Sequence, residues 1–468
     1  MRSWRLSRAR PRRVEPPGHH TMSWARANGY LESLGVDAMK AKTPSLHRIE
    51  ALLDALDHPE RQVPAVHITG TNGKTSTARI TAAVLSATGL SVGSYTSPHL
   101  ERVCERIALN GDAISEDIFG DTFEHLWPFI ELVESRLDEK LTYFELLTAM
   151  FFLWAVEAPV DAVVVEVGLG GRWDATNVVN APVSVITNVG LDHTGLLGSD
   201  PTVIAREKAG IIKPDGAVVT GERLPDVLSV LEEAARGAGA PVLALDRDFH
   251  LADNNIALGG RYLSIQTAGG AFGPSGDREK GEEYTDLYLP LHGRHQGVNA
   301  AVALQAAALF LPGQSLSSEV VTEGFAATPG AGRLEVIRKA EAEASIVLDV
   351  AHNPAGMSVL VSALAETFPF EQVCFVVGVL AGKDLDGMVL EMARLKCSIV
   401  ATQANSARSI PPQDIKVAAK SSGLDCMVIG DLAAALVYAR GATSLGDLIC
   451  VTGSHYVVGE ARGLLIGS

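Results

Sequence analysis

The stretch that decides the fold is PAVHITGTNGKTSTARITAAV, which occupies residues 64–84. The apolar run at residues 66–68 is short and predicts a buried strand. A polar loop with two glycines follows it, and small and apolar side chains beyond the loop, such as Ala78 and Ile80, predict a helix. A loop between a strand and a helix N-terminus offers backbone amides to phosphate groups. The sequence therefore predicts a phosphate-binding unit of strand, loop and helix.

This loop carries a lysine and a hydroxyl residue where phosphate binding requires them. In that interpretation Lys74 neutralises the β- and γ-phosphates, and Thr75 offers its hydroxyl group to a phosphate or to Mg²⁺. The full pattern would have a glycine at Ile68, so the loop is a shortened version. A glycine-rich turn with a solvent-facing lysine is the alternative, and the flanking strand and helix argue against it. The residues expected to contact ATP here are Thr71, Asn72, Gly73, Lys74, Thr75 and Ser76.

The rest of the first 312 residues continues the alternation of strands and helices. Short β-branched runs at residues 163–167 and 183–186 predict buried parallel strands between helices such as the one predicted at residues 145–156. A doubly wound α/β sheet follows from this pattern. Residues 253–283 show weaker alternation interrupted by glycines, which predicts a peripheral β-excursion with a loop, to which we assign no chemistry.

Prolines and glycines near residues 311–332 indicate a domain boundary. Beyond it, strands and helices alternate again and predict a smaller Rossmann-like domain. We therefore expect a P-loop ATP-binding domain over residues 22–312, a linker over 313–332 and a C-terminal domain over 333–468. Residues 1–21 are Arg-rich and lack an apolar core, so they predict a disordered leader or a mis-assigned start, with a mitochondrial transit peptide as the alternative.

Composition excludes several classes of function. The 468 residues have a net charge of −16, which opposes binding to nucleic acid and to anionic lipid. No apolar run is long enough to span a bilayer. The five cysteines form no CxxC pair, as in proteins of a reducing cytoplasm. We expect a cytoplasmic monomer with small-molecule substrates and with neither nucleic-acid nor membrane partners.

Polar residues follow two of the predicted strands. Glu166 ends one strand and precedes a glycine-rich turn, so it lies at the carboxyl edge of the sheet, where an oxygen ligand suits Mg²⁺. The next strand leads to His193 at the same edge. Taken alone, His193 is more often a structural histidine, but its place beside Lys74 and Glu166 favours a metal ligand. By physics alone, Lys208 is simply a surface or ion-paired cation.

Nine short motifs, in order, carry a family resemblance over nearly all of residues 46–460. They are GTNGKT (70–75), SPHL (97–100), TYFE (142–145), EVGLGGRWDATN (166–177), LDHT (191–194), EKAGI (207–211), HQGVNA (295–300), DVAHNP (349–354) and TGS (452–454). In this order they resemble the bifunctional dihydrofolate synthase/folylpolyglutamate synthase branch of the Mur ligase superfamily. The resemblance implies a P-loop central domain of the Mur ligase type and a smaller Rossmann-like C-terminal domain.

The resemblance also implies the reaction. The γ-phosphate of ATP would pass to a pterin-linked carboxylate, and the amine of L-glutamate would attack the acyl phosphate, whose leaving group metals and Lys74 can stabilise. By resemblance, Ser97 and Glu166 hold a first Mg²⁺ and His193 holds a second. Lys208 matches a lysine that is carbamylated near the second ion, which reverses the reading of Lys208 as a simple cation.

The remaining residue roles also come from the resemblance. Asn299 would meet the adenine side, and Arg333 and Asp349 would reach ATP from the C-terminal domain. His352 and Ser454 match positions that hold the incoming glutamate, and His352 also counts as catalytic. The segment Thr142, Tyr143, Phe144 and Glu145 matches a pterin-contacting one, in which Phe144 would stack on the ring; the alternative for Phe144 is an ordinary core aromatic.

Three departures from the family pattern stand out. The usual Pro-Gly-Arg before the second domain is two residues longer here and ends at Arg333, Trp173 replaces a leucine, and His455 replaces an apolar residue. Two other functions compete with folate ligation. A Mur-type ligase acting on a UDP-sugar peptide would share the loop, the metals and the lysine, whereas a nucleotide-binding switch would need neither Lys208 nor a second domain.

Overall fold

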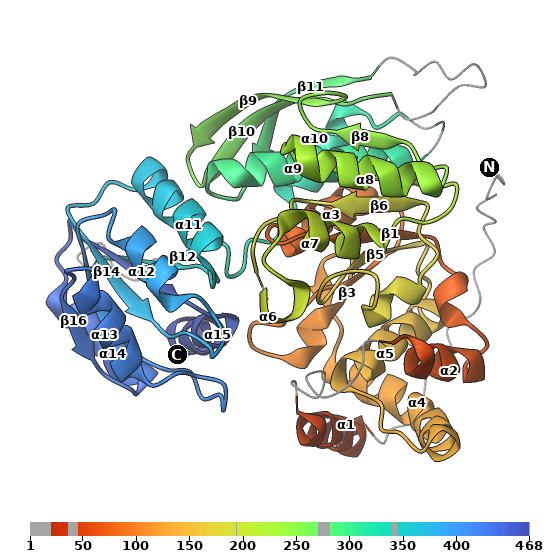
Figure 1. Cartoon of the computed structure of the whole chain (residues 1–468), viewed down its shortest axis with the longest axis horizontal. Coiled ribbons are helices and arrows are strands. Elements are labelled where there is room, and N and C mark those ends of the chain that lie inside the picture. The colour runs from red at the N-terminus through yellow and green to blue at the C-terminus, as the bar shows by residue number, and fades with distance from the viewer. Residues whose placement is uncertain are drawn as a thin grey trace.

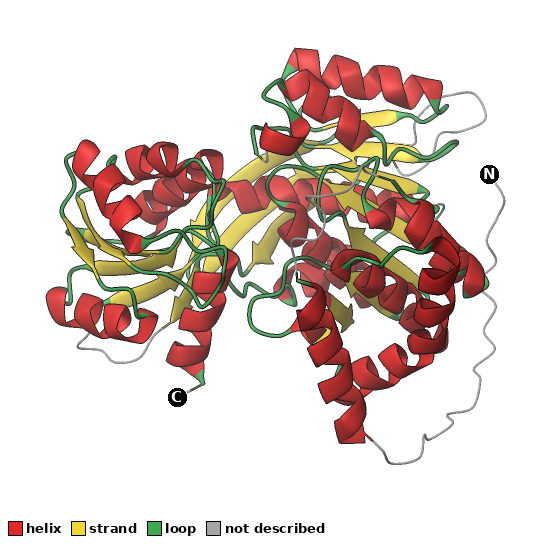
Figure 2. Cartoon of the chain, turned by 60° about the horizontal axis from the view of Figure 1, so that its bottom comes forward, coloured by secondary structure: helices red, strands yellow, loops and turns green. Residues whose placement is uncertain are grey.

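The computed structural model describes residues 20–35, 45–192, 194–269, 281–311, 313, 315–337 and 344–467. They form a larger N-terminal and a smaller C-terminal α/β domain, which lie side by side (Figures 1 and 2). The predicted α/β class is therefore confirmed. The prediction for residues 1–21 falls outside the described residues except at His20 and Thr21, where the first helix begins.

The large domain is built on an eight-stranded sheet in the order β4-β3-β2-β5-β1-β6-β7-β8. Its strands are β1 (Ala65–Thr69), β2 (Val92–Tyr95), β3 (Ile107–Leu109), β4 (Asp112–Ala113), β5 (Ala162–Glu166), β6 (Val183–Ile186), β7 (Ala217–Thr220) and β8 (Val242–Ala244). Pairing is parallel from β2 to β8 and antiparallel at the β3 and β4 edge. The central strands are buried along their whole length, which is why they read as continuous apolar runs.

Helices cover both faces of this sheet, and successive strand residues alternate between the two cores. Val164 packs in the cluster under one set of helices, whereas Val163 and Val165 pack in the cluster on the other face. The first set is α3 (Lys74–Ala87), α9 (Arg294–Phe310) and α10 (Ser318–Ala326). The second set is α1 (His20–Leu34), α2 (His47–Ala55), α4 (Glu116–Leu137), α5 (Tyr143–Glu157), α6 (Thr194–Leu197), α7 (Pro201–Ala209) and α8 (Pro225–Gly237).

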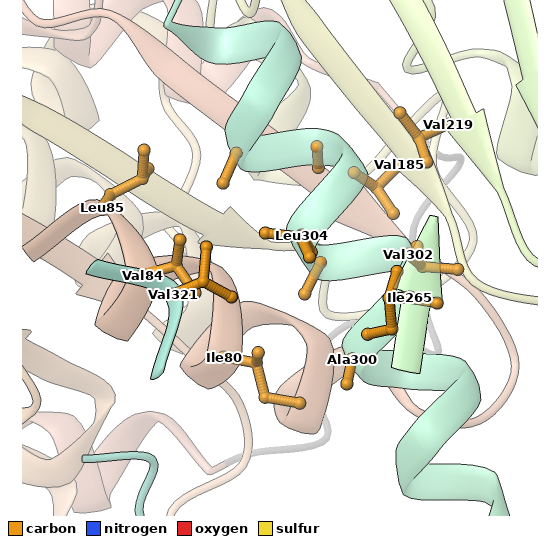
Figure 3. Packing of buried hydrophobic residues seen from close by; sticks show 14 of the residues in the cluster. Ile80, Val84, Leu85, Val185, Val219, Ile265, Ala300, Val302, Leu304 and Val321 are labelled. Carbon is orange, nitrogen blue, oxygen red and sulfur yellow. The ribbon is translucent and has the colours of Figure 1, made fainter. Parts of the chain in front are cut away.

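The helix that starts at the phosphate loop is fixed by the core around it. Figure 3 shows Ile80, Val84 and Leu85 of α3 packed with Leu304 of α9 and Val321 of α10. All five side chains are fully buried. Because close-packed interiors tolerate little displacement, this cluster holds α3, and with it the loop at its N-terminus, in one position relative to the sheet.

The predicted β-excursion is a separate three-stranded antiparallel sheet, in the order β11-β10-β9. Its strands are β9 (His250–Ala257), β10 (Gly260–Gln266) and β11 (Glu283–Leu289). The loop predicted between β10 and β11 falls mostly outside the described residues. Leu263 and Ile265 of β10 enter the same core cluster as α9, so the small sheet is packed onto the large domain rather than detached from it.

The C-terminal domain has a six-stranded sheet in the order β12-β13-β17-β14-β15-β16, with β12 antiparallel. The strands are β12 (Glu335–Ile337), β13 (Ser345–Leu348), β14 (Val373–Val377), β15 (Cys397–Ala401), β16 (Cys426–Val428) and β17 (Leu448–Thr452). The helices are α11 (Pro354–Thr367), α12 (Leu385–Met392), α13 (Pro412–Ser421), α14 (Leu432–Ala442) and α15 (His455–Ile466). No helix in the described part of either domain combines the length and apolarity that crossing a membrane requires.

The segment predicted as a linker, residues 313–332, differs from the expectation because it contains α10. Val321 and Phe325 of this helix are fully buried in the core of the large domain. Gly324 allows the close approach, since a Cβ there would lie 2.6 Å from the Cα of Val84. Helix α10 is therefore part of the large domain, and the connection begins only after it.

Replacing Phe325 with alanine tests this assignment. A fully buried phenylalanine in a packed core should lower the free energy of unfolding of the large domain by about 3–5 kcal/mol when truncated. Urea denaturation of the Phe325→Ala variant measures the loss. Leu258→Ala is the control, because Leu258 is 92% exposed and its loss should stay within about 0.5 kcal/mol. A similarly small loss for Phe325→Ala would mean that the segment is a linker after all.

Candidate functional site

Three neighbouring strands of the large sheet end at one place. The order β5-β1-β6 brings their carboxyl ends together. β1 leads into the phosphate loop, β5 ends with Glu166, and β6 leads to the residues before His193. Ligands of open α/β sheets bind outside the carboxyl ends of the strands. The arrangement thus brings the loop with Lys74, Glu166 and the residues before His193 to a single edge, and His193 itself lies outside the described residues.

Glu166 is a buried carboxylate held by the phosphate loop. Its side chain belongs to a residue only 1% exposed. The Thr75 hydroxyl donates to its two oxygens at 3.0 and 3.1 Å, and the backbone N–H of Ser97 donates at 3.1 Å. Burial raises the pKa of Glu166, and the nearby charge of Lys74 is the first influence that opposes the rise. The carboxylate, the hydroxyl and Ser97 therefore form one contact group.

Two lysines converge on the carbonyl oxygen of Gly70. Lys74 Nζ lies 3.0 Å and Lys208 Nζ 2.9 Å from this oxygen. Burial, followed by the charge of Lys74, lowers the pKa of Lys208 to about 7. Burial also lowers the pKa of Lys74. This lower pKa makes the neutral amine of Lys208 more accessible near neutral pH, and a neutral amine can react as a nucleophile, whereas an ordinary surface lysine is charged.

The donor set at this edge fits a magnesium ion that shares its coordination with phosphate. Within the described ranges, no three side chains of histidine, cysteine, aspartate or glutamate gather as a protein-built metal cage. Mg²⁺ does not need such a cage, because it keeps several waters and binds through one or two carboxylates together with substrate phosphates. Glu166, with Thr75 and Ser97 against it, supplies that kind of set.

Asn299 reaches the phosphate loop from α9. A Cβ on Gly73 would lie 2.5 Å from Asn299 Oδ1, and Gly73 has φ 82°, so both space and backbone conformation require glycine there. The amide of Asn299 donates to the buried Gln296 at 3.0 Å. The structure therefore places Asn299 directly beside the loop that is predicted to bind ATP.

Arg333 and Asp349 come from the C-terminal domain. Asp349 accepts the backbone N–H groups of Leu334 and Ala351 at 3.0 and 2.9 Å, which fixes its carboxylate. Burial lowers the pKa of Arg333, and the charges of Asp349 and Glu166 oppose this shift. Although the connection before Arg333 is two residues longer, the charge of its guanidinium group still interacts with that of Glu166.

Asp192 joins the two domains at the site. Its carboxylate accepts Lys383 Nζ at 2.8 Å and Asn353 Nδ2 at 3.0 Å, and His352 Nε2 lies 3.6 Å away. Asn353 also reaches Asn72 of the phosphate loop at 3.4 Å. No role was predicted from the sequence for Asp192, Lys383 or Asn353. The signal for Lys383 was its position shortly after β14, at the carboxyl end of a parallel strand.

The two residues predicted to hold glutamate lie in adjacent segments. His352 Nδ1 lies 2.8 Å from the carbonyl oxygen of Val350, and its ring is 5.3 Å from that of His455. Burial and then the charge of His352 lower the pKa of His455 well below its usual value. Ser454 is 1% exposed and accepts the N–H of Val457, so its visible role is to cap α15.

The predicted pterin segment divides into structural and exposed parts. Thr142 and Glu145 form a capping box at the start of α5, and Glu145 also pairs with Arg48 at 3.0 Å. Tyr143 is buried in the core. Phe144 is only partly buried and lies against Gly168, where a Cβ would come within 2.6 Å of the ring. Phe144 is therefore the member of the segment that faces the glycine-rich turn after Glu166.

A separate cavity of about 430 Å³ lies on the α3 side of the sheet. Its lining includes Arg79, Glu101, Glu105, Pro329 and Arg462, and it contains none of the predicted site residues. Arg79 donates to the carbonyl of Ala331 in the connection between the domains at 3.1 Å. The cavity therefore borders the interdomain connection, not the edge where the predicted site residues meet.

Two family profiles match this chain. The Mur ligase middle domain matches residues 68–307, and the Mur ligase glutamate ligase domain matches residues 332–455. The dihydrofolate synthase/folylpolyglutamate synthase of Mycobacterium tuberculosis is 41% identical over 392 residues, which cover 80% of this chain and 77% of that protein. The folylpolyglutamate synthase of Lacticaseibacillus casei is 34% identical over 454 residues, covering 95% of this chain and 99% of that protein.

Solved structures agree with these sequence comparisons. Folylpolyglutamate synthase of Mycobacterium tuberculosis, complexed with ADP and AMPPCP, superimposes with a TM-score of 0.86 at 38% identity and covers 96% of this chain and 99% of that one. A folylpolyglutamate synthase complexed with AMPPCP and folate superimposes with a TM-score of 0.81 at 32% identity, covering 95% and 100%. Both domains and their connection therefore have counterparts in these structures.

Thr75→Val tests the contact between the loop and the carboxylate. The isosteric change removes the hydroxyl that donates to Glu166, so it should weaken binding of Mg²⁺-AMPPCP by about tenfold while changing binding without Mg²⁺ by less than about twofold. Titration calorimetry with and without Mg²⁺ measures both. Thr75→Ser keeps the hydroxyl and is the matched control. Equal weakening in the two conditions would show that the hydroxyl serves the fold rather than a metal-bound nucleotide.

Proposed function

Because the chain belongs to the dihydrofolate synthase/folylpolyglutamate synthase branch of the Mur ligase family, we propose that it joins L-glutamate to a folate-type carboxylate with ATP as co-substrate. The acceptor is dihydropteroate, the γ-carboxylate of a reduced folate, or both. The relatives complexed with AMPPCP and with folate support these substrate classes.

One observation carries the proposal. The second domain places Lys383, Asn353 and His352 around a carboxylate that lies beside the phosphate loop. A nucleotide-binding switch needs only the loop and a metal, whereas a ligase must hold a third substrate next to the γ-phosphate. A cation and a histidine delivered from a separate domain suit an amino acid with carboxylates and a reactive amine.

The first step activates the acceptor. An oxygen of the folate-type carboxylate attacks the γ-phosphorus of ATP, the bond to the β-phosphate breaks, and an acyl phosphate and ADP result. Lys74 and Arg333 stabilise the negative charge of the phosphates. Mg²⁺ bound through Glu166, Thr75 and Ser97 would supply further charge neutralisation there. The N–H groups of the phosphate loop orient the nucleotide.

The second step forms the amide. The neutral amine of L-glutamate attacks the acyl carbon, the C–O bond to phosphate breaks, and inorganic phosphate leaves. We assign the carboxylate of glutamate to Lys383, which Asp192 holds in position at 2.8 Å, and the ammonium proton to His352. Ser454 contributes through the N-terminus of α15, which it caps. Domain closure excludes water, which would otherwise hydrolyse the acyl phosphate.

Lys208 acts as a carbamate in this proposal. Its neutral amine would combine with CO₂ and release a proton, which turns a cation into an anion, and this carbamate, together with the predicted ligand His193, would help to hold a second Mg²⁺. The lowered pKa of about 7 supports this chemistry, because the neutral form reacts. Protonation below pH 7 removes the nucleophile, so the carbamate is favoured as pH rises through neutrality.

The acceptor site, the location and the assembly complete the proposal. Phe144 stacks on the pterin ring at the turn after Glu166, since its ring is the partly exposed one of its segment. The enzyme works in the cytoplasm, which the five unpaired cysteines support. It works as a monomer, because both domains of one chain supply the site residues.

Glutamate-dependent ADP formation tests the proposed function directly. The purified chain with Mg²⁺-ATP should release ADP only when L-glutamate and a folate-type acceptor are both present. Dihydropteroate and tetrahydrofolate are offered separately, with a coupled assay for ADP. Activity with both defines a bifunctional enzyme, and activity with tetrahydrofolate alone a polyglutamate extender. If neither supports turnover while a UDP-sugar peptide does, the folate assignment is wrong.

Lys208→Ala tests the carbamate. The change should lower kcat by about 100-fold, because a group next to the metal and phosphates is lost. Acetate or formate should restore part of the activity by supplying the missing carboxylate. Lys213→Ala is the matched control, since Lys213 is another partly buried lysine, bonded to Asn177 at 2.7 Å, and small carboxylates should not rescue it. Full activity of Lys208→Ala without added carboxylate would exclude the carbamate role.

A further inference from the structure

Helix α11 is attached to the large domain at both of its ends. At its N-terminus Asn353 donates to Asp192 at 3.0 Å and caps the helix by accepting the N–H of Gly356 at 2.7 Å. Near its C-terminus Glu366 accepts Arg294 Nε at 2.9 Å. With 14 residues, the helix spans about 20 Å between these attachments. Figure 1 shows α11 on the side of the smaller domain that faces β9 and β10.

The distal attachment is built from a buried arginine. Arg261 of β10 is 1% exposed, and its Nη1 and Nη2 lie 3.4 and 3.3 Å from the two oxygens of Glu366. Its Nη2 also donates to the backbone oxygen of Asn254 at 2.6 Å. A buried guanidinium needs a partner for its charge, and the carboxylate that pairs with it comes from the other domain.

The group formed by Arg261, Glu366 and Asn254 is linked to the predicted nucleotide site through α9. Asn254 donates to the carbonyl of Arg294, the first residue of α9, at 2.9 Å. Asn254 also packs so tightly on Gly297 that a Cβ there would lie 2.5 Å from its amide nitrogen. Two residues further along, Asn299 lies beside the phosphate loop. The small sheet thus contacts both α11 and the helix that carries a predicted ATP contact.

We propose that Glu366, paired with Arg261 and Arg294, is a positioning residue that docks the C-terminal domain on the β9–β11 sheet and holds His352 over the nucleotide site. This inference rests on the proposed function for the role of His352, but the docking itself does not. The Glu366 contact adds to Asn353 at the N-terminus of α11, to the close approach of Ala363 to Gly293 and to the ring contact of Phe368 with His292. Two attachments about 20 Å apart fix its direction, and with it the residues just before its N-terminus.

An ordinary surface ion pair would have little effect, because exposed pairs contribute almost nothing to stability. This one differs, since Arg261 is buried and Glu366 serves two arginines from two elements of the opposite domain. The contact also occurs only when the domains are together. The Glu366 contact should therefore increase the fraction of molecules in which the domains are closed. Its loss should weaken the apparent affinity for glutamate, the substrate that we assign to the second domain.

Glu366→Gln and Arg294→Gln test the proposal in kinetics. Glu366→Gln should raise the KM for glutamate by about fivefold to tenfold and lower kcat, while the Kd of AMPPCP changes by less than about twofold. Arg294→Gln should act in the same direction with a smaller effect, because Arg294 is the exposed partner of Glu366. Arg294 is 79% exposed in its side chain, so its replacement leaves folding intact. Because Glu366→Gln already removes the Arg294 pair, the double variant should lose little more than Glu366→Gln alone. Glu232→Gln, which removes an ion pair to Arg247 within the large domain, is the control.

Interdomain distance gives a readout that does not depend on turnover. Spin labels on Leu258→Cys in the large domain and Val437→Cys in the small domain report the distance between the two domains. Leu258 is 92% exposed and Val437 is 72% exposed, so both positions are accessible to the label. Cys397 and Cys426 are first replaced by serine. With AMPPCP bound, Glu366→Gln should shift the distribution to longer distances, and the Glu232→Gln distribution should match the parent. An unchanged distribution together with unchanged KM would overturn the proposal. A shifted distribution in a chain without ligase activity would support docking and refute the proposed function instead.

Discussion

A carboxylate buried at the end of a central strand is the constraint on which the site depends. Glu166 is 1% exposed, and burial alone would push its proton affinity up and favour the neutral acid. The structure opposes this with the charge of Lys74, the hydroxyl of Thr75 and the backbone of Ser97. Those groups come from the phosphate loop and the neighbouring strand end. Compensating one charge therefore brings the predicted phosphate-binding loop, with Lys74, against a candidate magnesium ligand in an otherwise acidic protein.

The second domain is attached to this site by similar contacts between opposite charges. Asp192 in the large domain gathers Lys383, Asn353 and His352 from the small one. At the other end of α11, Glu366 in the small domain meets Arg261 and Arg294 in the large one. Each contact places an acid of one domain against cations of the other. These two contacts are therefore polar, which suits an enzyme that must open for three substrates and close for the reaction.

Local sequence patterns predicted the fold well, but they could not predict contacts between residues that are far apart in the sequence. The strand, loop and helix around Lys74, the strand ending at Glu166 and the two-domain α/β architecture follow from residue order. The position of α10 could not be predicted, because its nine residues lie in a segment with the sequence pattern of a linker. The structure shows that Gly324 allows this helix to pack closely on α3. The motifs indicated His352, but Lys383 and Glu366 act across domains, and a single sequence gives no register between them.

The central claim is that the folate-type carboxylate is activated as an acyl phosphate at this site. The most direct measurement supplies dihydropteroate labelled with ¹⁸O in its carboxylate and follows the label by mass spectrometry of the inorganic phosphate released with Mg²⁺-ATP and L-glutamate. When the amine attacks the acyl phosphate, inorganic phosphate leaves with one oxygen of the former carboxylate, so we predict ¹⁸O-labelled phosphate in the same amount as the amide product. Amide formation with unlabelled phosphate, or with the label in AMP, would contradict the account.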